Sequence, residues 1–304
     1  MKETFNRILS AVILLPILVF CITYKGMDYL PLYALGLITL FLGVSEFYGF
    51  SDRGLEGKPF RLTGYFFAFL IFTLYYLRFL NQQPFVEVSG FLKTIAGYFG
   101  AGYDLVVPAI FLFFVVVFSM QVILRPLEGA IFTVASSVLG VLYLAVPLGH
   151  FMLTLSLKNG IFYIWFIAGL TMITDTGAYF GGRWLGKHPA GLKVSPKKTW
   201  EGYVMGVISA VLYVLALKYI WLAITGVEAP VGYVESAILA PIFAFISVMG
   251  DLSESAMKRD AKVKDSSSVI PGHGGSLDVI DAMLFTIPIF YFYLKLKEVL
   301  GNPI

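Results

Sequence analysis

The chain has 304 residues, of which 58% are hydrophobic and 13% charged, and its mean hydropathy is +0.83. A soluble domain carries roughly a quarter charged residues, so the composition excludes that class and predicts a polytopic integral membrane protein. The formal net charge is only +3, and no nucleic-acid partner is expected. Because Cys21 is the only cysteine, an intrachain disulfide and a cysteine metal site are excluded.

Charge-poor apolar runs predict an all-α fold of about nine transmembrane helices, since a helix needs about 20 apolar residues to cross a bilayer. Residues 81–103 are mixed in character and are interpreted as a loop with an interfacial helix. The uncharged stretch 129–157 exceeds one span, so part of it is expected to lie along the membrane interface. The predicted spans lie near residues 8–24, 29–50, 62–80, 105–124, 129–149, 160–180, 203–224, 233–250 and 279–296.

Lysine and arginine placement predicts the orientation in the bilayer. With the N-terminus inside, fifteen of the 22 basic residues fall in cytoplasmic segments, and nine of these lie in two loops, at 183–198 and 258–264. We therefore expect a multi-pass protein of the cell (inner) membrane with a cytoplasmic N-terminus. The chain is divided into an N-terminal region, 1–159, and a C-terminal region, 160–304, which carries the cytoplasmic loops 181–202 and 251–278.

Asp175 and Glu46 are acidic residues inside predicted spans. An ionisable group at the centre of a membrane helix costs at least ~2.5–3.5 kcal/mol and usually marks function. Asp175 is followed by Tyr179 and Phe180, which continue the apolar run, so it is expected to face a polar interior rather than the interface. Glu46, in the second span, is interpreted as structural.

The segment SPKKTWEG, 195–202, precedes the seventh span. Ser195 and Pro196 predict the start of a helix, with proline at its first position. Lys197 and Lys198 would then lie beside the exposed amides of a helix N-terminus, where an anion is favoured. This arrangement predicts contact with a phosphate or a lipid headgroup.

A third polar segment runs from Gly250 to Asp281. On a helix beginning at Asp251, the residues Asp251, Ser255, Lys258 and Lys262 would lie within about 60° of one another. A solvated cytoplasmic face would have the same pattern. The mixture of a carboxylate, a hydroxyl and ammonium groups is nevertheless the set needed to bind metal and phosphate together.

The glycine loop, PGHGG at 271–275, completes this segment. Gly272, Gly274 and Gly275 allow backbone amides to approach a phosphate closely. Asp278 and Asp281 are three residues apart and are predicted to share one face of the last span. Helix capping would explain Asp278 but not Asp281. Hard oxygen ligands near lysines predict Mg²⁺ carrying a nucleotide phosphate.

The three histidines receive no firm role. His273 lies between glycines. It is a candidate for three roles: a general base, a hydrogen-bond donor to phosphate, or a structural part of the loop. His150 and His188 have no polar cluster around them in the sequence and are expected to be incidental.

The segment from Ser255 onward resembles the signature of the CDP-diacylglycerol synthases, also called phosphatidate cytidylyltransferases. The resemblance covers about the last 135 residues, including DTGAYFGGRWLGK and SPKKTWEG. Two positions depart from it, since Ser276 replaces an apolar residue and Val279 replaces an arginine, and this puts the exact substrate in doubt. The matching residues are Ser255, Lys258, Arg259, Lys264, Asp265, Ser267, Ile270, Pro271 to Gly275, Asp278 and Asp281.

The resemblance implies a nucleotidyltransferase of phospholipid biosynthesis, which converts CTP and phosphatidate into CDP-diacylglycerol and pyrophosphate with Mg²⁺. The phosphate oxygen of phosphatidate is already ionised, so catalysis would consist mainly of positioning and charge neutralisation. Asp251 and Asp278 are the principal candidate metal ligands, followed by Asp281, Asp265 and Asp175. The candidate binders of the triphosphate or the lipid phosphate are Lys197, Lys198, Lys258, Arg259 and Lys264.

Other functions remain open. The same chemistry could act on another lipid phosphate, as in a CDP-archaeol-type synthase, or on a polyprenol, as in a CTP-dependent kinase. A transporter of an anionic substrate is disfavoured, because no paired broken helices are evident in the sequence. The sequence leaves room for a second, monovalent ion. The oligomeric state is left open by the sequence, and a homodimer is one candidate, since a neighbouring subunit would shape a lateral opening toward the bilayer.

Overall fold

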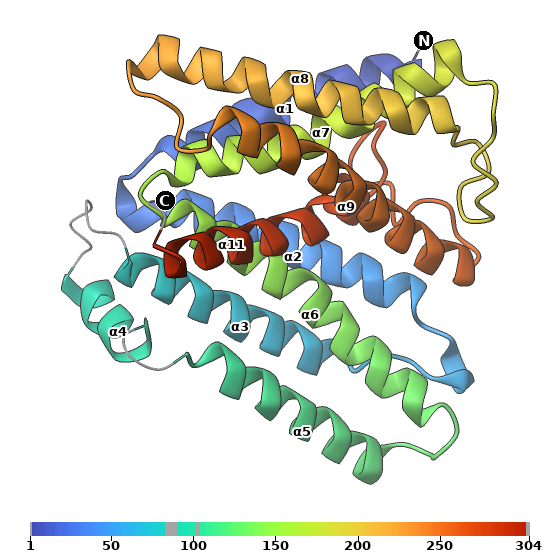
Figure 1. The fold of residues 1–304 in the computed structure, drawn as a ribbon. Helices are drawn as coiled ribbons and strands as arrows, with labels where there is room; N and C mark the ends of the chain where they lie inside the picture. The colour runs from blue at the N-terminus through green and yellow to red at the C-terminus, as the bar shows by residue number, and fades with distance from the viewer. Residues whose placement is uncertain (1, 83–89, 101–103, 302–304) are drawn as a thin grey trace. The chain divides into compact units, whose positions relative to one another are not determined.

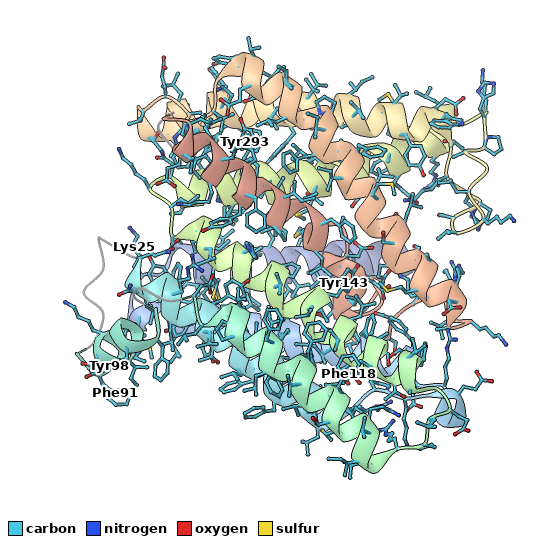
Figure 2. All side chains as sticks on the ribbon, turned by 60° about the horizontal axis from the view of Figure 1, so that its bottom comes forward. Lys25, Phe91, Tyr98, Phe118, Tyr143 and Tyr293 are labelled. Atoms are coloured by element: carbon cyan, nitrogen blue, oxygen red, sulfur yellow. The ribbon has the colours of Figure 1, made fainter. Side chains whose placement is uncertain are left out.

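The computed structural model describes residues 2–82, 90–100 and 104–301, and its regular elements there are helices (Figure 1). Part of the loop predicted at 81–103, namely 83–89 and 101–103, lies outside the described residues. The remainder contains a helix, α4 (Gly90–Gly100). Phe91 and Tyr98 lie one above the other on its outer side and are 76% and 79% exposed (Figure 2). The helix predicted there is present, and its location at a membrane interface stays a prediction.

Eight helices in the described part of the chain are long and apolar enough to cross a membrane, which confirms the all-α polytopic fold. The first predicted span, near residues 8–24, falls on α1 (Lys2–Thr23), whose apolar part in the described residues, Val12–Thr23, is shorter. The eight spans are α2 (Leu30–Phe50, with Met27–Tyr29 before it), α3 (Arg61–Asn81), α5 (Val106–Leu124), α6 (Ala130–Leu155), α7 (Gly160–Leu185), α8 (Trp200–Thr225), α9 (Tyr233–Asp260), and α10 (Ser276–Ile280) together with α11 (Met283–Val299).

The chain forms two compact units. The first unit comprises Met1–Ser156 and Ala261–Ile280, and the second comprises Leu157–Asp260 and Asp281–Ile304. The segment that carries the glycine loop therefore packs with the N-terminal helices, although it is distant from them in the sequence.

Within the first unit, α3 and α6 run side by side (Figure 1). Tyr48 of α2 is fully buried and its hydroxyl donates to the carbonyl of Ser137 on α6, at 2.7 Å. The Ser137 hydroxyl in turn accepts from the amide of Phe60, at 2.8 Å, and so satisfies a donor at the start of α3. These buried hydrogen bonds connect three spans.

Within the second unit, α7 and α8 lie alongside each other over their length (Figure 1). Glycines allow this close approach, as small residues commonly do between membrane helices. A Cβ atom at Gly206 would lie 2.9 Å from the carbonyl oxygen of Thr174, and one at Gly202 would lie 2.8 Å from that of Ala178. The packing fixes the two ends of the connection between α7 and α8, which carries Lys197 and Lys198.

Two local predictions are wrong. α9 is helical only to Asp260, and Lys262 has a φ of +60°, so Lys262 does not continue the polar stripe of Asp251, Ser255 and Lys258. The last span does not begin as one helix either. α10 ends at Ile280 and α11 begins at Met283, so Asp278 belongs to α10 whereas Asp281 lies in the break, and the two do not share a helical face.

Candidate functional site

The second unit contains a group of acidic side chains on α7, on α9 and at the break before α11. The carboxylate of Asp251 on α9 forms an ion pair with the ammonium of Lys198, and both side chains are partly buried. Asp175 on α7 interacts electrostatically with both of these groups. Asp175, Lys198 and Asp251, which lie in separate segments of the sequence, therefore interact with one another in the folded chain.

Asp281 belongs to the same group. It is 8% exposed, lies at the break between α10 and α11, and interacts electrostatically with Asp251, Glu254 and Asp175. Its Oδ1 accepts from the amide of Ala282, at 2.6 Å. We refer to Asp175, Asp251, Glu254 and Asp281 as the acidic cluster.

Gly250 explains how α9 approaches Asp281 so closely. A Cβ atom at this position would lie 2.9 Å from the Cα of Ala282 and 3.0 Å from the carbonyl oxygen of Asp281. Both neighbours are backbone atoms, which cannot move aside as a flexible side chain can. The glycine thus allows the helix that carries Asp251 to pack against the segment that carries Asp281.

Glu254 was not predicted from the sequence. Its side chain is fully buried and forms an ion pair with Lys258, one turn later on α9. The spacing of four residues between an acid and a lysine is a recognisable signal for such a pair. Lys258, a predicted phosphate ligand, is therefore buried beside a carboxylate.

The predicted helix start at Ser195 and Pro196 is wrong. α8 begins at Trp200, and the hydroxyl of Thr199 caps it by accepting from the amide of Gly202, at 3.2 Å. Because Thr199 caps the helix, the preceding residues are free to form a turn, in which the amide of Lys198 donates to the carbonyl of Ser195 at 3.2 Å. Lys198 reaches Asp251 from this turn.

The other histidines have local structural partners. The backbone amide of His188 donates to the carboxylate of Glu201, at 3.2 Å, and its Nδ1 contacts the same group. His150 is buried on α6, where its Nδ1 is 2.8 Å from the carbonyl oxygen of Val146. Neither lies in the acidic cluster.

The glycine loop lies in the first unit, next to Glu46 of α2. The Glu46 carboxylate is 7% exposed and accepts four hydrogen bonds from the residues on either side of the loop. The donors are the hydroxyls of Ser266 (3.1 Å) and Ser267 (2.7 Å) and the amides of Ser276 (2.9 Å) and Leu277 (2.8 Å). The interpretation of Glu46 as structural agrees with these contacts.

Asp278 also contacts the loop itself. Its Oδ2 accepts from the amide of Ser266 at 2.9 Å, the hydroxyl of Ser266 at 2.8 Å and the amide of Gly275 at 2.7 Å. The amides of His273 and Gly274 both donate to the carbonyl of Ile270, at 3.1 Å. Several of the amides expected to contact phosphate thus have partners within the loop, and both metal binding by Asp278 and phosphate binding by these amides stay predictions.

The glycines have two structural roles here. Gly272 and Gly274 have φ values of +81° and +95°, a backbone region that favours glycine. A Cβ atom at Gly275 would lie 2.0 Å from the Ser266 hydroxyl and 2.5 Å from Oε2 of Glu46. Gly275 therefore gives the serine hydroxyl and the Glu46 carboxylate room to meet.

The remaining candidates are more accessible. Ser255 is partly buried, whereas the exposed candidates are Lys197, Arg259, Lys264, Asp265 and His273. Among the described residues, no three histidine, cysteine or acidic side chains are arranged so that they could hold a metal ion by themselves. A metal ion at the acidic cluster would need further ligands, such as water or phosphate oxygens.

Comparison with known proteins gives a family match over nearly the whole chain, because residues 5–297 match the model of the cytidylyltransferase family. The chain is 43% identical over 136 residues to the phosphatidate cytidylyltransferase of Haemophilus influenzae, which covers 44% of this chain and 46% of that protein. The corresponding enzyme of Bacillus subtilis is 36% identical over 139 residues, 46% of this chain and 49% of that protein. An uncharacterized Escherichia coli protein, YnbB, is 30% identical over 187 residues, 60% of each chain.

These pairwise matches are partial, since the chain spans less than half the length of the first two relatives. The match to the family model, in contrast, runs from residue 5 to residue 297, so it extends over parts of both units and over all but the last two residues of the eight spans found in the described part of the chain. The chain belongs to the cytidylyltransferase family.

Proposed function

We propose that this protein is a CTP:phosphatidate cytidylyltransferase, which forms CDP-diacylglycerol and pyrophosphate. The observation that supports this most directly is the acidic cluster, in which Asp251 is paired with Lys198 and interacts with Asp175 and Asp281. Oxygen ligands beside an ammonium group suit a metal-bound triphosphate. The names of the relatives from Haemophilus influenzae and Bacillus subtilis agree with this substrate pair.

The donor set of the acidic cluster fits Mg²⁺. This ion usually keeps several waters and binds through one or two carboxylates plus substrate phosphates, so a site without three protein ligands is compatible with it. We expect Asp251 to hold the ion, with Asp281 and Asp175 as further ligands or as partners of its waters. When bound, Mg²⁺ would neutralise negative charge on the phosphate oxygens.

The transfer itself requires little proton chemistry. An ionised phosphate oxygen of phosphatidate attacks the α-phosphorus of CTP, a new P–O bond forms, and the bond to the β-phosphate breaks to release pyrophosphate. Lys198 is expected to donate to a phosphate oxygen, and Lys197, Arg259 and Lys264 are further candidates for this role. These groups would align the two substrates and stabilise the charge of the leaving pyrophosphate.

Transfer of labelled CMP from CTP to phosphatidate by purified protein tests the proposal. We expect Mg²⁺-dependent CDP-diacylglycerol and an equal amount of pyrophosphate. Product from a diether lipid phosphate but not from phosphatidate would keep the reaction and change the substrate. Transfer of the γ-phosphate to a polyprenol would identify a kinase instead, and failure with all three acceptors would refute the proposal.

Replacing Lys198 tests the role of the ammonium group. The Lys198→Gln variant should raise the KM for CTP by about 10–100-fold, since a hydrogen bond to a charged group contributes about 1.5–3 kcal/mol. The matched control is Lys193→Gln, because Lys193 is exposed on the same connection between α7 and α8. Equal KM values in the two variants would show that Lys198 serves only as the partner of Asp251.

Orientation and assembly also remain proposals. We expect the connections at 186–199 and 261–275 to face the cytoplasm, as the basic residues in them predict. The homodimer and the second, monovalent ion, both left open by the sequence, are not tested by the structure.

A further inference from the structure

We propose that Glu46 is a positioning residue for the glycine loop, so that a carboxylate in the second span sets the geometry of a loop more than 200 residues later. This inference rests on the proposed function, because the loop is expected to contact the substrate phosphates. Glu46 would act through the loop and would not touch the substrate itself.

The hydrogen bonds of Glu46 divide evenly between its two oxygens. Oε1 accepts from the Ser267 hydroxyl at 2.7 Å and the Ser276 amide at 2.9 Å. Oε2 accepts from the Ser266 hydroxyl at 3.1 Å and the Leu277 amide at 2.8 Å. Each oxygen thus binds one hydroxyl and one backbone amide.

These donors lie on both sides of the glycine loop. Ser266 and Ser267 precede it, and Ser276 and Leu277 begin α10 directly after it. The hydroxyl of Ser10 on α1 donates to the carbonyl of Pro271, at 2.7 Å, and restrains the loop between these ends. Because both ends bind one buried carboxylate, the path of the loop depends on Glu46.

A glutamine cannot reproduce this arrangement. The side-chain amide has one oxygen and one NH₂ group, whereas each Glu46 oxygen faces a backbone amide that can only donate. Whichever way the glutamine is turned, its NH₂ group therefore faces the amide of Ser276 or Leu277. An aspartate is one methylene shorter and cannot reach all four donors from the same position on α2.

The alternative is that Glu46 only stabilises the fold. A variant that is merely less stable has fewer active molecules, so its kcat falls while its KM values stay unchanged. A variant that folds normally but has a displaced loop instead has a changed affinity for the substrate that the loop contacts. Tyr48→Phe is the matched control, because Tyr48 lies on the same helix and also loses a buried hydrogen bond, to Ser137, that does not involve the loop.

The experiment compares Glu46→Gln, Glu46→Asp and Tyr48→Phe in one detergent. We measure kcat, the KM for CTP, the KM for phosphatidate, and hydrogen exchange of the peptide spanning 264–278. Both Glu46 variants should raise the KM for CTP or for phosphatidate, depending on which phosphate the loop contacts, by about 10–100-fold, since displacements near 1 Å can cost about 100-fold. Exchange at 264–278 should accelerate in these variants and not in Tyr48→Phe.

Unchanged KM values with a lower kcat would show a structural role only and overturn the proposal. Hydrogen exchange separates this failure from failure of the proposed function, because it needs no turnover. If the wild-type protein transferred no CMP but exchange accelerated in the Glu46 variants alone, the positioning of the loop would stand and the reaction would be wrong. If exchange stayed at the wild-type rate, the positioning role would be refuted whatever the activity.

Discussion

Asp251→Asn is expected to lower the kcat for CMP transfer by about two to three decades, which corresponds to about 3–4 kcal/mol of transition-state stabilisation. The substitution keeps the size of the side chain and removes its charge. It thereby removes the partner of Lys198 and the central member of the acidic cluster. Initial rates at saturating CTP and phosphatidate, measured over a range of Mg²⁺ concentrations, test this expectation.

Asp260→Asn is the matched control for charge. Asp260 is exposed and lies nine residues further along α9, half a turn away around the helix axis. We expect this variant to keep wild-type kcat within about twofold, because Asp260 is exposed and does not belong to the acidic cluster. Equal losses in the two variants would show that the rate depends on the net charge of α9 and not on Asp251. Full activity of Asp251→Asn would remove the acidic cluster from the proposed mechanism.

The spans could be predicted from the sequence because the bilayer fixes the length of an apolar helix. Within the described part of the chain, eight of the nine predicted segments correspond to helices that are long enough and apolar enough to cross it. The ends of these helices depend on local hydrogen bonds, which apolar runs do not encode. Thr199 rather than Ser195 caps α8, and the break after Ile280 places Asp281 between two helices.

The candidate site was partly predictable for a different reason. Asp175 stands out because an ionisable residue in an apolar run is costly, and the same argument draws attention to Glu46. The sequence could not show which polar groups form hydrogen bonds or ion pairs with each carboxylate. The partners of Glu46 lie 220 to 231 residues away, so only the folded chain reveals that this acid holds the ends of the glycine loop.

The glycines of the loop illustrate the same limit. Their pattern predicts backbone amides that face a phosphate, since glycine permits close approach. In the structure a Cβ atom added at Gly274 would meet the carboxylate of Asp278, and one added at Gly275 would meet Ser266 and Glu46. A sequence pattern shows that space is needed at a position but does not identify the group that occupies it.

Gly275→Ala is therefore expected to displace the glycine loop. Its effect on activity should be the largest after that of Asp251→Asn. The new methyl group would lie 2.0 Å from the Ser266 hydroxyl and 2.5 Å from Oε2 of Glu46, so one of these atoms must move. Overpacking costs about 1–3 kcal/mol and an unsatisfied buried polar group costs a similar amount. We expect kcat/KM for CTP to fall by about 100-fold, the size of effect that a displacement near 1 Å can have. The unfolding temperature in detergent should fall by several degrees.

Gly49→Ala is the control for Gly275→Ala. It adds a methyl group to the chain without a contact to Ser266 or Glu46. Gly49 lies on α2, one turn after Glu46, and a Cβ atom there would meet no heavy atom within 4 Å. Alanine should be neutral or stabilise the helix by about 0.5–1 kcal/mol, with kcat/KM unchanged. Wild-type kinetics in Gly275→Ala would mean that the loop tolerates the displacement of Glu46 or Ser266. The position of the loop would then not depend on the Glu46 carboxylate, and the acidic cluster would have to account for catalysis without it.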